Sequence, residues 1–248
     1  MKKPLILSLA VLAFATASQA QIFKDILKKD STGKNGVQKI LQKATTKSSL
    51  SNDEIISGLK EALNVGANNS TGKLSMVDGF FKDAAIKILM PAEAQKVEQK
   101  LRSIGLGKQV DNAILSMNRA AEDAAKSATP IFINVIKGIT IQDGLGILKG
   151  GDFAATNYLK GKTLSQLTEA FRPVIEQSLQ KVNATKYWKT VFSTYNTFSQ
   201  EKVNTDLTAY VTDKALSGIF YQVGLEEQKI RKDPVARTTD LLKKVFSN

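Results

Sequence analysis

The feature that most constrains this chain is the spacing of its apolar residues, which recur every third or fourth position from about residue 51 onward. This period places apolar side chains along one face of a helix, whereas a half-buried strand alternates apolar and polar residues. Strict alternation is almost absent, and residues 86–90, "IKILM", are the only candidate strand. We therefore predict an all-α fold: an irregular multi-helix bundle that forms a single domain over residues 51–248.

Local signals indicate where several of these helices begin and bend. Ser51, with Glu54 three residues later, forms a capping box that predicts the first helix of the domain. Two long helices are expected over residues 108–127 and 205–232. Pro173 predicts a kink inside a further helix, because proline removes a backbone hydrogen bond.

The composition excludes several kinds of catalytic and metal-binding site, because the chain contains neither cysteine nor histidine. Disulfides, thiolate nucleophiles, Cys/His zinc sites and imidazole bases are all excluded, and so is a Ser-His-Asp triad. An enzyme built on this chain would have to use carboxylates, a Ser/Lys pair or an oxygen-ligated metal. We predict no cofactor and no metal site.

The first twenty residues have the pattern of a secretory signal peptide. A start with two lysines precedes an apolar run over residues 4–15, and small residues follow at Ser18 and Ala20. Cleavage is expected before Gln21, which predicts a periplasmic or secreted protein. The alternative is an uncleaved anchor, although the apolar run is shorter than the roughly 20 residues that a membrane span needs.

Residues 21–50 form a basic N-terminal arm ahead of the helical domain. They carry seven lysines against Asp25 and Asp30, a local excess of +5, in a chain whose net charge is +12. Such an excess favours an anionic membrane surface or another envelope component as partner. Nucleic acid is not expected as a partner of an exported protein. Alternatively, the arm packs on the domain and its lysines only keep the protein soluble.

The stretch "SMNRAAEDAAKSATP" sets polar residues among alanines on one predicted helix. Small side chains let a neighbouring helix approach closely. Asn118 and Glu122 fall at the edge of the apolar face, so they are expected at the boundary of the core. Arg119 lies one helical turn from Glu122 and can form an ion pair with it.

The long C-terminal helix carries a matching pair. Glu227 falls within its apolar stripe, and Arg231 follows four residues later. A buried carboxylate needs a partner, because burying it alone costs several kcal/mol. We therefore predict that Arg119, Glu122, Glu227 and Arg231 form one network between the two helices. Removing one member would cost about 3–5 kcal/mol if the site is dry.

Four stretches together resemble one known family: "VDGFFKDAAIKILMP", "MNRAAEDAA", "DFAATNYLKGKT" and "YVTDKALSGIFYQVGLEEQKIRKDPVARTTDLLKKVF". The chain is similar over residues 51–248 to the exported bacterial family catalogued as domain of unknown function 4197. The resemblance implies export, a single domain and a helical fold. It implies no catalytic residues, because the family has no assigned activity.

Three hypotheses about function follow from these residues. In the first, the protein is a non-catalytic ligand- or envelope-binding protein, with polar site candidates Asn118, Arg119, Glu122, Asp152, Thr156, Tyr158, Glu227 and Arg231. In the second, it is a hydrolase of envelope material that uses Glu122 and Glu227 as paired carboxylates. In the third, the polar groups only fix the register of the helices and form no site.

Overall fold

The structure is a computed structural model that describes residues 50–198, 200, 202 and 205–246. The signal peptide expected over residues 1–20 and almost all of the basic arm expected over 21–50 lie outside the described residues. All regular structure within them is helical, which confirms the all-α prediction. The α-helices are α3 (Asn52–Leu74), α4 (Gln95–Ser103), α5 (Gly107–Ala125), α6 (Ala128–Lys137), α7 (Ile141–Lys149), α8 (Ala154–Lys181), α9 (Ala184–Phe198), α10 (Leu207–Lys232) and α11 (Asp240–Val245), with short 3-10 helices at Ala92–Ala94 and Pro234–Ala236.

Two helices begin with a capping box. The Ser51 hydroxyl accepts a hydrogen bond from the backbone N–H of Glu54 at 3.2 Å, and the Glu54 carboxylate accepts one from the backbone N–H of Ser51 at 2.9 Å. This confirms the predicted start of α3. Thr140 and Asp143 make the same reciprocal pair at the start of α7. Each box satisfies backbone donors that a helix start otherwise leaves open.

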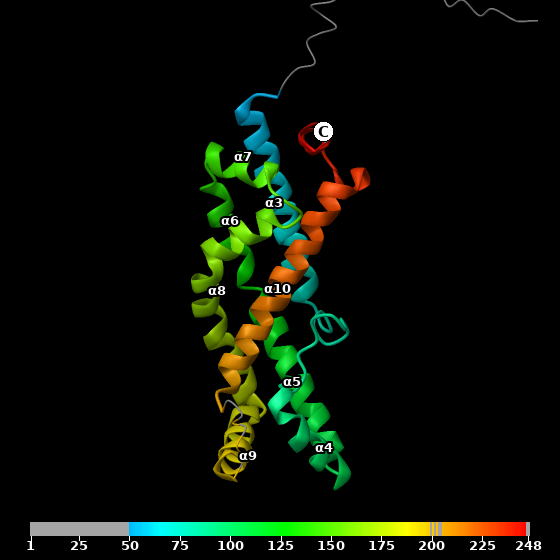
Figure 1. Cartoon of the computed structure of the whole chain (residues 1–248), viewed down its shortest axis with the longest axis vertical. Coiled ribbons are helices and arrows are strands. Elements are labelled where there is room, and N and C mark those ends of the chain that lie inside the picture. The colour runs from blue at the N-terminus through cyan, green and yellow to red at the C-terminus, as the bar shows by residue number, and fades with distance from the viewer. Residues whose placement is uncertain (1–49, 199, 201, 203–204, 247–248) are drawn as a thin grey trace, which may run out of the picture. The chain divides into compact units, whose positions relative to one another are not determined.

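Helix α10 is central to the bundle, since it packs against α3, α5, α8 and α9. Figure 1 shows it running diagonally across the described unit, with α3 and α8 beside it. Its predicted apolar stripe is buried throughout; the members are Leu216, Ile219, Phe220, Val223 and Ile230. The stripe predicted for the helix over residues 108–127 is also buried, with Val110, Ile114, Met117, Ala121 and Ala124 on α5 and Ala128 at the start of α6. Phe220 meets Phe132 of α6 edge to face, with ring centroids 6.0 Å apart.

Residues 75–91 form an irregular segment that joins α3 to the short 3-10 helix before α4. Residues 86–90, the candidate strand, form no strand, because residue 86 lies in a turn and residues 87–91 have no regular secondary structure. Asp78 lies in the left-handed region, with φ of 70°. Next to it, a Cβ on Gly79 would lie 2.5 Å from the carbonyl oxygen of Lys73, so only glycine fits there.

Pro173, where a kink was predicted, lies inside α8. Helix α8 continues from Ala154 to Lys181 as one helix, so Pro173 does not end or divide it. In the described part of the chain, no single helix is long and apolar enough to cross a membrane; the bent pair Gly107–Lys137 and Ile141–Lys149 meets that test by length and composition alone.

The C-terminal helix α11 packs against α3. Leu242 is fully buried in a small cluster with Ala62 and Ile230. A Cβ on Gly58 of α3 would lie 2.7 Å from Cγ2 of Val245, so the absence of a side chain there lets α11 approach closely. Helix α11 thus lies beside α3 near the C-terminal end of α10 (Figure 1), where Leu242 packs with Ile230 of α10.

Candidate functional site

Asn118 of α5 holds the irregular segment of residues 75–91. Its side chain is fully buried. The amide oxygen accepts a hydrogen bond from the backbone N–H of Ile88 at 2.9 Å, and the amide nitrogen donates to the carbonyl oxygen of Ile88 at 2.8 Å. The amide thus bonds both backbone groups of one residue, as a neighbouring strand would. It satisfies polar groups that are costly to bury unpaired.

Glu122 of α5 anchors the other end of the same segment. One carboxylate oxygen accepts hydrogen bonds from the backbone N–H groups of Phe80 at 3.1 Å and Phe81 at 3.2 Å. The other oxygen accepts one from Arg119 at 2.6 Å, and Arg119 also donates to Asp78 at 2.7 Å. The hydrogen bond to Glu122, and then the one to Asp78, raises the pKa of Arg119. The predicted Arg119–Glu122 pair is confirmed, and it ties α5 to residues 78–81.

Glu227 of α10 binds the first turn of α8. Its carboxylate accepts hydrogen bonds from the backbone N–H groups of Ala155 at 3.0 Å and Thr156 at 2.8 Å, and from the Thr156 hydroxyl at 2.7 Å. The first turn of a helix has unpaired N–H donors and partial positive charge, so a carboxylate is favoured there. Glu227 thus replaces a capping side chain at the start of α8, where residue 153 supplies none.

Arg231 binds the last turn of α7 from the same face of α10. It donates to Glu227 at 2.9 Å and to the carbonyl oxygen of Ile147 at 2.8 Å. A cation is favoured at a helix C-terminus for the converse reason. The Glu227–Arg231 pair therefore joins the end of α7 and the start of α8 to α10, with each charge placed at the helix end that stabilises it.

The prediction of a single network was wrong. Glu122 and Arg119 belong to one cluster, and Glu227 and Arg231 to another, and no hydrogen bond or ion pair between described residues joins the two. The physical reason is that each carboxylate finds its arginine on its own helix, one turn away. Each then uses its remaining capacity on backbone N–H groups of a third segment, which leaves it no need of the other helix.

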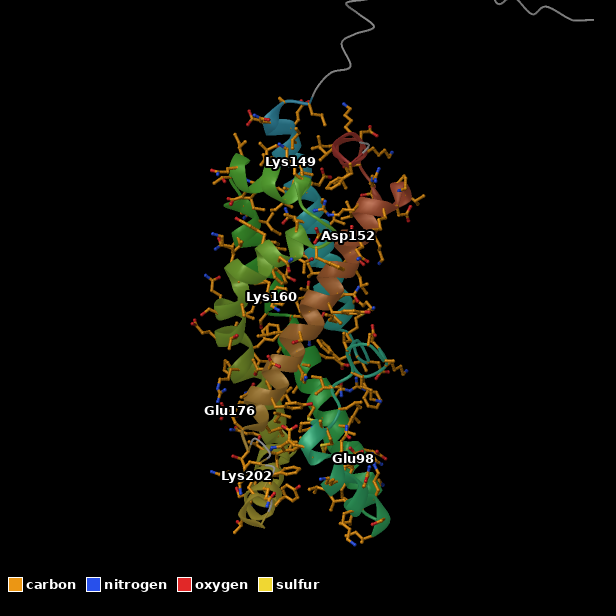
Figure 2. The ribbon with its side chains drawn as sticks, viewed as in Figure 1. Glu98, Lys149, Asp152, Lys160, Glu176 and Lys202 are labelled. Carbon is orange, nitrogen blue, oxygen red and sulfur yellow. The ribbon has the colours of Figure 1, made fainter. Side chains whose placement is uncertain are left out.

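The remaining candidates lie apart from these buried contacts. Asp152 is exposed at the corner between α7 and α8, where it pairs with Lys232 of α10 at 2.5 Å (Figure 2). Tyr158 is half-buried beside Asp143 of α7. Burial raises the pKa of Tyr158, and the negative charge of Asp143 raises it further. Asp152 thus adds a surface ion pair at the α7–α8 corner. Tyr158 contacts α7 at Asp143.

Two of the predicted polar residues, Glu227 and Arg231, line a cavity, but it is a small one. The cavity beside Glu227 and Arg231 has a volume of only about 20 Å³ and is lined mainly by apolar side chains, including Leu59, Val223 and Phe246. That volume holds about one water molecule. Nor does any group of three or more Asp or Glu side chains in the described residues gather as a metal site would.

A larger hollow, which sequence reasoning missed, lies between α10 and the irregular segment of residues 75–91. We call it the tyrosine groove; it has a volume of about 410 Å³ and is lined by Ala85, Ile86, Lys87, Ile88, Leu89, Tyr210, Lys214, Ser217, Gly218 and Tyr221. The signal that could have revealed it is the spacing of Tyr210, Lys214, Ser217 and Tyr221 along one face of α10. A second hollow of about 440 Å³ lies over residues 73–84.

The fold and these contacts define the class: an all-α protein in which the buried glutamates Glu122 and Glu227 hold the helices and the irregular segment of residues 75–91 in place. The chain belongs to the family described as "Protein of unknown function (DUF4197)", whose model matches residues 49–247. The resemblance seen in the sequence is thereby confirmed. No curated protein matches the chain, and no solved structure matches it.

Proposed function

We propose that this protein is an exported, non-catalytic binding protein of the cell envelope. One observation carries the choice of binding over catalysis. The two glutamates proposed as a catalytic pair are buried and already accept hydrogen bonds on both oxygens, Glu122 from Phe80, Phe81 and Arg119, and Glu227 from Ala155, Thr156 and Arg231. A general acid must exchange a proton with its substrate, and a nucleophile must reach it. Both carboxylates are buried and bound to the fold through both oxygens, so neither is placed to reach a substrate.

The hydrolase alternative also needs its two carboxyl groups about 5–10 Å apart across one substrate. Glu122 and Glu227 instead serve separate clusters that hold different segments, residues 78–81 in one case and the α7–α8 corner in the other. The cavity that Glu227 lines has a volume of about 20 Å³, which is far too small for a sugar. These contacts favour the interpretation in which the polar groups stabilise the fold and binding occurs elsewhere.

The binding partner that the sequence favours is an anionic surface, contacted through residues 21–50. Lysine is a strongly hydrated point charge, suited to diffuse attraction rather than to recognition of a shaped ligand. Each lysine near an anionic membrane contributes about 1 kcal/mol, so an excess of five charges supports reversible binding. Removal of residues 1–20 on export would leave this arm at the start of the mature chain.

Co-sedimentation with phosphatidylglycerol vesicles tests the proposal. We compare the chain from Gln21 with a chain from Ser51 and with a full-length arm whose seven lysines are replaced by glutamine. The first should sediment at low salt and be released near 1 M salt, where the Debye length falls to about 3 Å. The other two should stay in solution. Equal sedimentation of all three chains would remove the arm as the anchor.

Export is tested separately by sequencing the N-terminus of the protein isolated from its own cells. The expected first residue is Gln21, or a residue one or two positions away. A protein that still begins at Met1 would contradict cleavage without bearing on the vesicle result.

A further inference from the structure

The tyrosine groove is preformed by contacts on both of its walls. The Tyr210 hydroxyl donates to the carbonyl oxygen of Leu89 at 2.8 Å, which joins α10 to the irregular segment of residues 75–91. Asn118 holds the backbone of Ile88 from the opposite side. A Cβ on Gly218 of α10 would lie 2.5 Å from the ring of Phe80, so the absence of a side chain at Gly218 lets Phe80 pack closely against α10.

The groove exposes apolar side chains that the fold does not use. Leu89 is 55% exposed and Tyr221 is 46% exposed, although both are large and lie against a wall of the groove. Tyrosines are enriched in protein interfaces, because they offer a large apolar surface together with a polar tip and lose little conformational freedom. Exposed apolar groups that line one hollow indicate a binding surface more strongly than the same groups scattered.

Two lysines of the groove have no carboxylate partner among the described residues. The ammonium group of Lys87 lies 4.0 Å from the centroid of the Phe81 ring, and that of Lys214 lies 5.7 Å from the centroid of Tyr210. The lysines that line the neighbouring hollow do have carboxylate partners. Lys73 pairs with Asp83, and Lys82 pairs with Asp78. The ammonium groups of both lysines are therefore available to pair with acidic groups of a ligand.

We propose that the tyrosine groove binds an extended, acidic and apolar peptide segment of a partner protein. From Tyr210 to Tyr221 the helix rises about 16 Å, at 1.5 Å per residue. An extended chain covers that length with about five residues, at about 3.3 Å each. The apolar side chains of such a segment would pack on Leu89 and Tyr221, and its acidic side chains would pair with Lys87 and Lys214.

The charges around the groove limit where those acids can lie. Glu93 and Asp213 act on Tyr210 through their negative charge, so the groove is not positive along its whole length. Acidic side chains are therefore favoured only next to the two lysines. A lipid acyl chain fits this site less well, because an open groove lined by hydroxyls and ammonium groups would leave much of the chain in contact with water.

The test uses the chain from Gln21 and a phage-displayed library of random heptapeptides. Enriched peptides are synthesised, and their affinity is measured by fluorescence anisotropy. Lys87→Glu/Lys214→Glu reverses both groove charges, and Ser217→Trp fills the groove. The matched control, Lys108→Glu/Lys149→Glu, makes the same change of net charge with two exposed lysines that do not line the groove; Lys149 is labelled in Figure 2. The basic arm is present in every variant, so differences between variants report on the groove alone.

We expect enriched peptides to combine acidic with apolar residues. The double reversal should weaken their binding roughly tenfold or more, since opposite charges at an interface become like charges. Ser217→Trp should abolish binding, and the control should bind as the unmodified chain does. If a groove variant fails to melt cooperatively, Tyr221→Ser replaces it, because that side chain is already half in solvent.

Two results would overturn the proposal. One is a failure to enrich any peptide, or equal binding by the unmodified chain and the double reversal. The other is a loss of phosphatidylglycerol vesicle binding, without loss of peptide binding, on reversing Lys87 and Lys214, which would assign the groove to lipid. The arm is the same in every variant, and the proposed envelope binding is tested by removing or neutralising the arm, so peptide binding by the groove can fail while the proposed envelope binding stands, and the reverse.

Discussion

Glu227 of α10 and Thr156 of α8 are joined by two hydrogen bonds to the same carboxylate oxygen, at 2.8 Å from the Thr156 backbone N–H and 2.7 Å from its hydroxyl. Both side chains are buried. A helix start is usually capped by a side chain that precedes it in the chain. Here the cap comes from a residue 71 positions later, so the beginning of α8 is stable only when α10 is in place.

Replacing Glu227 by alanine should therefore destabilise the whole domain. The substitution leaves the N–H groups of Ala155 and Thr156 without their acceptor and Arg231 without its carboxylate. We expect a loss of about 3–5 kcal/mol in the free energy of unfolding, as for breaking a buried ion pair. Urea denaturation followed by circular dichroism measures it. Glu176→Ala, an exposed change on α8, is the control and should cost under about 0.5 kcal/mol.

Glu122 and Arg119 should differ in their contribution to stability. The Arg119 side chain is 36% exposed, whereas that of Glu122 is 4% exposed. Arg119→Ala leaves Glu122 with both backbone donors, so we expect a loss of only about 1–2 kcal/mol. Glu122→Ala leaves the N–H groups of Phe80 and Phe81, and the Arg119 guanidinium, without this acceptor. It should lower the free energy of unfolding by about 3–5 kcal/mol. An Arg119→Ala protein that is less stable than Glu122→Ala would show that the ion pair, and not the backbone contacts, holds residues 78–81.

Much of the helical layout could be predicted from the sequence, because it depends on short-range pattern. The apolar faces of α5 and α10 are buried as their periods predicted, and the capping box at Ser51 lies where the pattern placed it. The Arg119–Glu122 and Glu227–Arg231 pairs also formed, since residues one helical turn apart on the same helix meet in any helical fold.

The partners of those pairs could not be predicted in the same way. Glu122 and Glu227 bind backbone N–H groups of Phe80, Phe81, Ala155 and Thr156, and a backbone group has no sequence signature. Which segment lies within reach depends on how the helices pack. For the same reason the tyrosine groove escaped notice, because one of its walls is an irregular segment with no periodic pattern.

Two glycines seven residues apart provide a test of the close packing of residues 75–91. A Cβ on Gly79 would meet the carbonyl oxygens of Lys73 at 2.5 Å and Leu74 at 2.7 Å, and backbone atoms cannot move aside cheaply. Gly79→Ala should therefore lower the free energy of unfolding by about 1–3 kcal/mol. A Cβ on Gly72, inside α3, meets nothing within 4 Å. Gly72→Ala should raise stability by about 0.5–1 kcal/mol, because alanine favours the helix. Thermal unfolding of both variants, read against the unmodified protein, checks the opposite signs.

The pH dependence of stability should report on Tyr210. Burial, and then the negative charges of Glu93 and Asp213, raises the pKa of Tyr210 to about 12. The unfolded chain ionises this phenol near pH 10, so folding favours the neutral form. The resulting stabilisation is fully present below about pH 10 and is lost as the pH rises toward about 12. Tyr210→Phe removes both the titrating group and the hydrogen bond to Leu89. The unmodified protein should therefore be more stable than Tyr210→Phe at pH 8, and that advantage should shrink between pH 10 and 12. Urea midpoints of the two proteins, measured at each pH, cancel the titration of the lysines. A difference that stays constant from pH 8 to 12 would show that Tyr210 ionises equally in both states.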